Sequence, residues 1–217
     1  MGIAVLLRHG HSTANNDGIL SGRLPGVFLT ERGESQARDL QPAFAQLDIH
    51  SVYVSPLERT RQTASLVFGE REFVDELGII ECDYGDWSGR SLKDLAEEPL
   101  WKTVQQDPGV VRFPNGESMA AMAARAVATT RERAAADGVH VFVSHGDIIK
   151  AIVNWASGAP FDAFQRITVD PCSVSIITTG DNPRVLAVNV PIPGAAAALA
   201  GLISTDRGTV GGGGGTP

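Results

Sequence analysis

Short apolar segments alternate along the chain with segments whose apolar residues recur at helical spacing. Residues 3–7 form a continuous apolar run, which is typical of a central strand covered on both faces. Thr30 suits the N-cap of a helix predicted over residues 31–47. A second strand is predicted over residues 51–55, and Pro56 suits the first turn of the helix that follows. The chain thus opens as strand, helix, strand, helix.

The rest of the chain continues this alternation with longer irregular stretches. Residues 13–29 are rich in Asn, Gly, Ser and Pro and are predicted as a long loop. The Ala-rich residues 116–136 place Met119 and Met122 at helical spacing and predict a long amphipathic helix. The other predicted elements are strands at 76–81, 140–144, 173–178 and 185–190, a helix at 147–157, and short helical pieces at 91–107 broken by Pro99 and Pro108.

This alternation predicts an α/β protein, a three-layer α/β/α sandwich with a mostly parallel central sheet. A length of 217 residues suits one compact domain, which we assign to residues 1–203. Residues 204–217 contain a run of five glycines and few apolar side chains, so we expect a flexible tail there.

Composition excludes several classes of function. The 43% apolar and 20% charged residues are typical of a globular protein, and the net charge of −7 argues against nucleic acid or an anionic membrane as partner. No apolar run approaches the roughly 20 residues of a membrane span, and the start lacks a signal peptide, so we expect a cytoplasmic protein. Cys82 and Cys172 lack the spacing of a zinc site and are expected to be reduced and structural.

Three predicted strands are each followed by a group that can react or bind phosphate. Arg8 and His9 come after the first strand, Arg59 lies beyond the second, and His145 comes after the fourth. Ligands of open α/β sheets bind beyond the carboxyl ends of the strands. We therefore expect these four side chains to converge on one pocket although they lie far apart in the sequence.

Three motifs in this order resemble those of the histidine phosphatase (phosphoglycerate mutase-like) superfamily, and the resemblance spans about residues 3–190. The motifs are Arg8-His9-Gly10 with Ser12 and Asn15, then Ser55-Pro56-Leu57-Glu58-Arg59-Thr60-Arg61-Gln62-Thr63-Ala64, and finally Ser144-His145-Gly146.

The resemblance implies that His9 is the nucleophile and becomes a phosphohistidine, which splits one difficult displacement into two easier ones. Two flanking guanidinium groups would keep its imidazole neutral. Arg8 and Arg59 would hold the phosphoryl oxygens, and His145 would donate to one of them. Such a pocket implies neither a metal nor a cofactor, because positioning and charge stabilisation are the main needs of phosphoryl transfer.

The leaving alkoxide needs a proton, and Glu81 is the candidate general acid because residues 81–89 resemble the acid motif of the family. A neighbouring phosphate dianion would raise its pKa and keep it protonated. Asp83, Asp86 and Asp147 remain rival carboxylates. Arg61, two positions after Arg59, is expected in an ion pair on the helix surface with Glu58 or Asp48.

Further pocket residues are expected on the long loop and after the second motif histidine. Asn15 is expected to donate to phosphate and Arg23 to face the substrate as a cation, with Ser21, Gly22 and Gly146 lining the same pocket. Trp87 and Trp101 are expected in core or lid packing rather than as stacking platforms.

The reaction predicted from the resemblance is metal-independent hydrolysis of a phosphomonoester. The predicted cap, formed by about residues 82–115, is short for a cofactor-dependent mutase, which must enclose its substrate and exclude water. A phosphoglycerate mutase-type phosphomutase and a non-catalytic phospho-ligand-binding module remain alternatives. The expected partner is a small phosphorylated metabolite with a partly apolar alcohol moiety. The sequence leaves the oligomeric state open, and a homo-oligomer is compatible with it.

Overall fold

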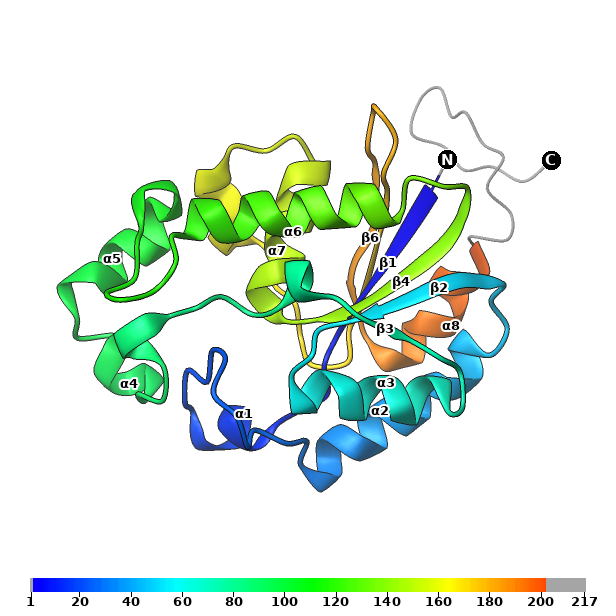
Figure 1. The fold of residues 1–217 in the computed structure, drawn as a ribbon, viewed down its shortest axis with the longest axis horizontal. Helices are drawn as coiled ribbons and strands as arrows, with labels where there is room; N and C mark the ends of the chain where they lie inside the picture. The colour runs from blue at the N-terminus through cyan, green and yellow to red at the C-terminus, as the bar shows by residue number, and fades with distance from the viewer. Residues whose placement is uncertain (1, 202–217) are drawn as a thin grey trace.

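The computed structural model describes residues 2–201; the expected tail at 204–217 lies outside this range. The described residues form three layers, with a six-stranded sheet between two groups of helices (Figure 1). This is the predicted α/β/α arrangement. None of the helices in residues 2–201 is both long and apolar enough to cross a membrane.

The sheet has the strand order β3-β2-β4-β1-β5-β6. Its parallel part contains β1 (Gly2–Arg8), β4 (Gly138–Ser144), β2 (Ile49–Val54) and β3 (Val74–Asp75). The strands β5 (Val174–Thr178) and β6 (Val185–Val190) complete it in the antiparallel sense. The predicted mostly parallel sheet is thus a mixed sheet with an antiparallel edge.

The central strand β1 explains the layering, because successive side chains of a strand point to opposite faces. Ala4 and Leu6 join the core beneath α6 (Met119–Arg133) and α7 (Gly146–Ala156). Val5 and Leu7 join the core beneath α2 (Glu31–Phe44), α3 (Glu58–Phe68) and α8 (Ile192–Ala200). Figure 1 shows these two helix groups on opposite faces of the sheet. Burial on both faces makes the strand continuously apolar.

Parallel pairing brings the ends of three strands together. Arg8 is opposite Ser144 in the β1–β4 register, so His9 and His145 leave the sheet side by side. The His9 backbone N–H donates to the Ser144 carbonyl at 3.0 Å, which extends the pairing one residue beyond β1. Ser55, which follows β2, donates its backbone N–H to the Val143 carbonyl at 3.0 Å.

Two local predictions were wrong. The loop predicted over residues 13–29 contains the helix α1 (Thr13–Asp17), because Ser12 and Asn15 form a reciprocal capping box. The strand predicted over residues 76–81 is instead a 3₁₀ turn, η1 (Leu77–Ile79), whose Gly78 N–H is capped by the Glu76 side chain. The third strand β3 comes just before it. Polar capping thus overrides what composition and apolar pattern favour.

A helix absent from the prediction closes the described chain. The Ala-rich α8 packs Ala195 and Leu199 against the same core as α2. Its weak periodicity hides it in the sequence, since small side chains carry little amphipathic signal.

The segment predicted as a cap, about residues 82–115, consists of short elements. They are η2 (Gly85–Trp87), α4 (Leu92–Leu95), α5 (Pro99–Gln106) and η3 (Pro108–Val110). Pro99 occupies the first turn of α5, where its missing N–H costs nothing. Trp87 and Trp101 stack on each other, with ring centroids 6.2 Å apart.

Candidate active site

His9 lies directly beyond β1 and the residue is only 4% exposed. Its Nδ1 lies 2.7 Å from the Gly10 carbonyl oxygen. A carbonyl can only accept, so Nδ1 carries the proton and Nε2 of the neutral ring keeps its lone pair. Burial, and then the charges of Arg59 and Arg8, hold the pKa of His9 well below its usual value. The ring is therefore neutral at physiological pH, with the lone pair of Nε2 available.

His145 is fully buried beside His9, with their ring centroids 5.3 Å apart. Its Nε2 lies 2.7 Å from the Ser55 hydroxyl. That hydroxyl can donate to Nε2, and Nδ1 then carries the proton. Burial and the nearby Arg59 also hold the pKa of His145 well below its usual value. Nδ1 has no hydrogen-bond partner among the described residues and lies 3.9 Å from a Glu81 carboxylate oxygen.

Arg8 and Arg59 bring two guanidinium groups to the same place. Arg8 Nη1 donates to the Val169 carbonyl at 2.5 Å, and Arg59 Nη2 donates to the Gly22 carbonyl at 2.8 Å. These bonds fix both side chains. Arg8 Nε, Arg59 Nε and Arg59 Nη1 are buried without a hydrogen-bond partner among the described residues.

Such unpaired buried donors are rare because each carries a desolvation cost. Here they occur together with His145 Nδ1 next to the neutral imidazole of His9. The helix α7 also begins here, because its first residue, Gly146, lines the cavity next to His9. Fixed donors around one point are what an anionic phosphoryl group requires. The local arginines also reconcile an anion site with a net charge of −7.

A hydroxyl couples His9 to Arg59. Thr63 of α3 accepts the Gly10 backbone N–H at 3.0 Å and donates to the Arg59 carbonyl at 2.7 Å. Thr63 is fully buried. The turn that carries His9 is therefore held to the helix that carries Arg59.

Glu81 lies beside this pocket and is 8% exposed. Burial first, and then the Asp147 carboxylate, raise its pKa to about 7, although Arg59 acts in the opposite direction. One of its carboxylate oxygens accepts the Cys82 N–H at 2.9 Å. A carboxylic acid that keeps its proton near neutral pH suits a general acid.

The rival carboxylates are placed differently. Asp83 and Asp86 do not belong to the cavity wall; Asp83 lies 3.8 Å from Arg23 and Asp86 accepts from Asn115. Asp147 does line the cavity. Its carboxylate, however, accepts the Tyr84 hydroxyl at 2.8 Å and lies 3.5 Å from the Lys150 ammonium.

A cavity of about 470 Å³ opens from His9, Arg8, Arg59 and Glu81. The segment predicted as a cap contributes an aromatic part of its wall, with Trp87, Trp101 and Phe113. A polar part of the wall comes from later in the chain and contains Asp147, Lys150 and Gln165. The volume is in the range of pockets that enclose small organic ligands.

The structure places the expected loop residues in two groups. Asn15, Ser21 and Gly22 line the cavity. Gly22 has a φ of 51°, and a Cβ there would meet the Tyr84 ring at 3.0 Å, so glycine lets its carbonyl reach Arg59. Arg23 differs from the expectation: it is absent from the cavity wall, and its guanidinium binds Glu117 and the Glu81 carbonyl.

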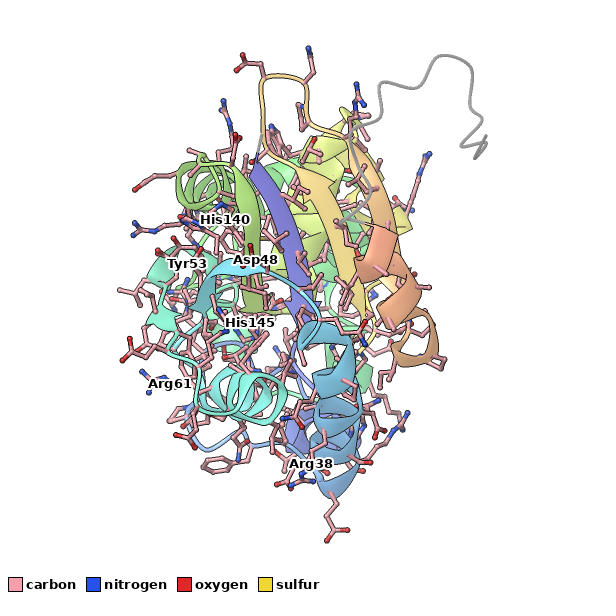
Figure 2. The ribbon with its side chains drawn as sticks, turned by 90° about the vertical axis from the view of Figure 1, so that its right-hand side faces the viewer. Arg38, Asp48, Tyr53, Arg61, His140 and His145 are labelled. Atoms are coloured by element: carbon pink, nitrogen blue, oxygen red, sulfur yellow. The ribbon has the colours of Figure 1, made fainter. Side chains whose placement is uncertain are left out.

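The remaining predicted residues are also located. His145 lies beside His9 but, unlike Gly146 next to it, is not among the residues of the cavity wall. Arg61 forms a surface ion pair, but with Asp75 rather than the expected acids, and Figure 2 shows it at the outside of the molecule. Cys82 and Cys172 are free and buried. Residues 2–201 contain no cluster of three or more His, Cys, Asp or Glu side chains placed to hold a metal.

Sequence reasoning missed two groups of polar residues. Tyr84 and Lys150 line the cavity and both contact Asp147, and Glu117 and Arg125 bind each other next to Glu81. Tyr84 lies inside the segment that resembles the acid motif, which gave a signal. Glu117 and Arg125 are eight residues apart around the start of α6, and nothing in that spacing indicates a shared site.

Comparisons with known proteins agree with this geometry. The model of the histidine phosphatase superfamily (branch 1) matches residues 4–190. The 2,3-bisphosphoglycerate-dependent phosphoglycerate mutase of Thermoplasma acidophilum is 28% identical over 183 residues, covering 82% of this chain and 87% of that protein. The adenosylcobalamin/alpha-ribazole phosphatase of Escherichia coli is 32% identical over 172 residues, covering 76% and 84%.

A solved structure extends the likeness to three dimensions. The alpha-ribazole phosphatase of Shigella flexneri superposes with a TM-score of 0.75 at 28% identity, covering 86% of this chain and 96% of that one. The relatives thus include phosphatases and a mutase, so similarity alone leaves the phosphoryl acceptor open.

Proposed function

The chain belongs to branch 1 of the histidine phosphatase superfamily, and from that premise we propose that it hydrolyses phosphate monoesters through a phosphohistidine on His9. The observation that carries the proposal is the convergence of a neutral imidazole with buried nitrogens of Arg8, Arg59 and His145 that have no hydrogen-bond partner among the described residues. This arrangement supports nucleophilic attack on an anionic group, because the donors act where charge develops.

In the first step, His9 Nε2 attacks phosphorus and the P–O bond to the alcohol breaks as the P–N bond forms. The proton of the Glu81 carboxyl passes to the departing alkoxide oxygen, giving a neutral alcohol and a Glu81 carboxylate. The donors of Arg8 and Arg59 hold the phosphoryl oxygens during transfer. The positive charge gained by the imidazole is stabilised by the hydrogen bond from Nδ1 to the Gly10 carbonyl.

In the second step, a water oxygen attacks phosphorus and the P–N bond breaks. The water gives its proton to the Glu81 carboxylate, so both Glu81 and His9 return to their starting states and inorganic phosphate is released. A pKa of about 7 suits Glu81 to act first as an acid and then as a base.

A phosphomutase is the second candidate, because the Thermoplasma relative bears that activity in its name. The two reactions share the first step and differ only in whether water or a substrate hydroxyl receives the phosphoryl group. The predicted shortness of the cap, about residues 82–115, favours water as acceptor, since a mutase must enclose its substrate. We further propose that the substrate is a small phosphorylated metabolite and that the enzyme acts in the cytoplasm.

The test uses the full chain, without added metal, on p-nitrophenyl phosphate, phosphoserine, several sugar phosphates and 3-phosphoglycerate. Phosphate release and isomer formation are both followed, beside the variant His9→Ala. We expect release that His9→Ala lowers by roughly 10³-fold or more, as loss of a nucleophile does in other enzymes. Brief incubation followed by quenching in alkali should leave a detectable phosphohistidine in the wild type and none in His9→Ala.

The other outcomes separate the alternatives. Isomer formation without release would assign the mutase reaction. Release that persists in His9→Ala would contradict the phosphohistidine mechanism. Phosphate binding without either reaction would assign a phospho-ligand-binding module.

A further inference from the structure

We propose that Arg125 is a positioning residue which, with Arg23 and Glu117, holds the Glu81 backbone so that its carboxyl group faces the leaving-group oxygen. These three residues are called the Glu117 cluster below. The inference rests on the proposed role of Glu81 as general acid. None of the three lines the cavity, so the cluster acts through Glu81 and not on the substrate.

The Glu81 carbonyl oxygen accepts two charged donors from different parts of the chain. Arg23 Nε donates to it at 2.8 Å from the loop after α1, and Arg125 Nη2 donates at 3.1 Å from α6. A carbonyl bound by two guanidinium groups cannot rotate without breaking both bonds. The Cα of Glu81, and with it the origin of the side chain, is therefore fixed from two sides.

Arg125 holds the residues before Glu81 as well. Its Nη1 donates to the Gly78 carbonyl at 3.0 Å and to the Ile80 carbonyl at 2.7 Å. Together with the bond to Glu81, one guanidinium group binds three carbonyls in four consecutive residues. These residues have no strand pairing of their own, since the expected strand at 76–81 is a 3₁₀ turn followed by irregular chain. Arg125 supplies the anchoring that a sheet would otherwise give.

Glu117 completes the cluster and fixes the residues after Glu81. One carboxylate oxygen accepts from Arg125 at 2.6 Å, from Arg23 at 2.9 Å and from the Asp83 N–H at 2.9 Å. The other accepts Arg125 Nε at 3.1 Å. Burial acts to raise the pKa of Glu117, but the hydrogen bonds from Arg125 and the Asp83 N–H hold it below its usual value. A two-point Arg–carboxylate pair orients both partners, which a Lys–carboxylate pair cannot do.

This cluster has a chemical consequence because proton transfer depends on geometry. A general acid must lie within hydrogen-bond reach of the oxygen that it protonates, and small misplacements cost rate. An ester whose alcohol is a good leaving group needs little proton transfer, whereas an alkyl ester needs much. Loss of positioning should therefore slow alkyl esters selectively, while a general loss of structure would slow both.

The experiment compares kcat/KM for ethyl phosphate, phenyl phosphate and p-nitrophenyl phosphate in the full chain. The variants are Arg125→Lys, Glu117→Gln and Arg23→Lys, with Glu81→Gln as the reference for loss of the acid. Arg131→Lys is the matched control, because Arg131 lies on the same helix but is exposed and contacts Trp155 instead. The ratio kcat/KM is used because it reports steps up to transfer onto His9.

We expect Arg125→Lys to lower kcat/KM about tenfold or more for ethyl phosphate and much less for p-nitrophenyl phosphate, short of the loss of about 10²–10⁴-fold typical of removing a general acid. Glu117→Gln should follow the same pattern, and Arg23→Lys should show it more weakly because Arg125 remains. In the Glu81→Gln background, Arg125→Lys should cause no further selective loss for ethyl phosphate. Arg131→Lys should match wild type.

Equal losses on all three esters in Arg125→Lys, or no loss on any, would overturn the positioning role. A selective loss that persists in the Glu81→Gln background would also overturn it, because the cluster would then act on another group. Should Arg125→Lys fail to fold, as circular dichroism would reveal, the half-exposed Arg23→Lys decides by the same ester series. Wild-type protein without phosphate release would instead refute the proposed function, which distinguishes the two failures.

Discussion

The two ends of β4 carry similar histidine clusters with different surroundings. Figure 2 shows His140 and His145 at different heights along the sheet. Toward the beginning of the strand, His140 Nδ1 lies 2.8 Å from the Ser51 hydroxyl and its Nε2 lies 3.1 Å from the Ala136 carbonyl. Its ring centroid is 4.9 Å from that of His50. Both ring nitrogens of this buried side chain therefore have partners.

At the other end, His145 contacts Ser55, which directly follows β2, and its ring lies beside that of His9. The pKa of His140 and that of His145 are both lowered, and burial is the largest cause in each case. Serine contact, ring contact and a lowered pKa therefore do not distinguish the two ends.

The difference lies in the donors that remain unpaired. His145 keeps one ring nitrogen without a partner among the described residues, and Arg8 and Arg59 bring further unpaired donors to the same place. Buried polar groups in a structural cluster satisfy one another, whereas a binding site keeps donors for its ligand. The comparison indicates that unsatisfied donors beside a cavity identify a site better than residue type does.

The strongest test of this comparison is to replace each of the two histidines by alanine. We expect His145→Ala to lower kcat for p-nitrophenyl phosphate by about 10²–10³-fold, as loss of a donor to a transition-state oxyanion does. The matched variant His140→Ala should keep kcat close to wild type at 25 °C, although its unfolding should occur at lower temperature. Similar kcat losses in the two variants would show that the ends of β4 do not differ as described.

A second comparison uses two arginines of the same helix. Arg59→Lys removes the planar fork of buried donors, and we expect kcat/KM for p-nitrophenyl phosphate to fall between about tenfold and 10²-fold. Arg61→Lys alters only an exposed ion pair with Asp75, so its kcat/KM should equal that of wild type. Steady-state kinetics of the purified pair checks this, and a loss in Arg61→Lys would contradict it.

The pH dependence sharpens the comparison through Glu81. Its carboxyl must be protonated to act as acid, so kcat/KM for ethyl phosphate should fall about tenfold per pH unit above a pKa of about 7. The ester is already a dianion in that range, since its second pKa is about 6. Burial holds the pKa values of His9 and His145 well below 6.5, so neither should cause an acidic limb near pH 6.5.

Glu81→Gln provides the control for this profile. The variant should lack the decline above pH 7, because its side chain does not titrate. Above pH 7 the variant should also unfold at a higher temperature than wild type. In the wild type, the raised pKa of Glu81 lowers the stability of the folded state at this pH, because the unfolded chain releases the carboxyl proton more readily than the folded chain does. This gain should disappear near pH 4. An unchanged decline in Glu81→Gln would assign the pH dependence to another group.

Inorganic phosphate gives the smallest expected effect. At ten times its Kd, phosphate should stabilise the wild type by about 1.4 kcal/mol, which raises Tm by about 3–6 °C for a chain of this size. His140→Ala should show the same shift from its own lower starting value, and Arg59→Lys should show a smaller one. Differential scanning fluorimetry measures these Tm shifts. Equal shifts in His140→Ala and Arg59→Lys would mean that phosphate binds away from Arg59.

The residues at strand ends were predictable from the sequence, and the residues that hold them were not. Residues 3–7 are followed by Arg8 and His9, and parallel strands bring their carboxyl ends together whatever the loops do. Residues 76–81, which end at Glu81, were predicted as a strand. Contacts with Arg125, more than forty residues later, determine their actual path.

Arg23 illustrates the same limit from the opposite side. Its position on a loop beside pocket residues indicated a cation that faces the substrate, but Glu117 binds its guanidinium instead. Pairing between charges distant in sequence depends on packing that local patterns do not encode. The helix α8 escaped prediction for a different reason, because alanines give no clear apolar face.

The position of β1 within the sheet also governs the order in which this protein can fold. The strand made first occupies the interior of the sheet, and its two neighbours begin at Gly138 and Val174. During synthesis, β1 cannot pair until both neighbours have been made, and its apolar side chains stay exposed until then. Contacts so distant along the chain slow folding. His9 and His145 meet only once β1 and β4 have paired, so recovery of activity during refolding should lag behind helix formation and report the completed sheet.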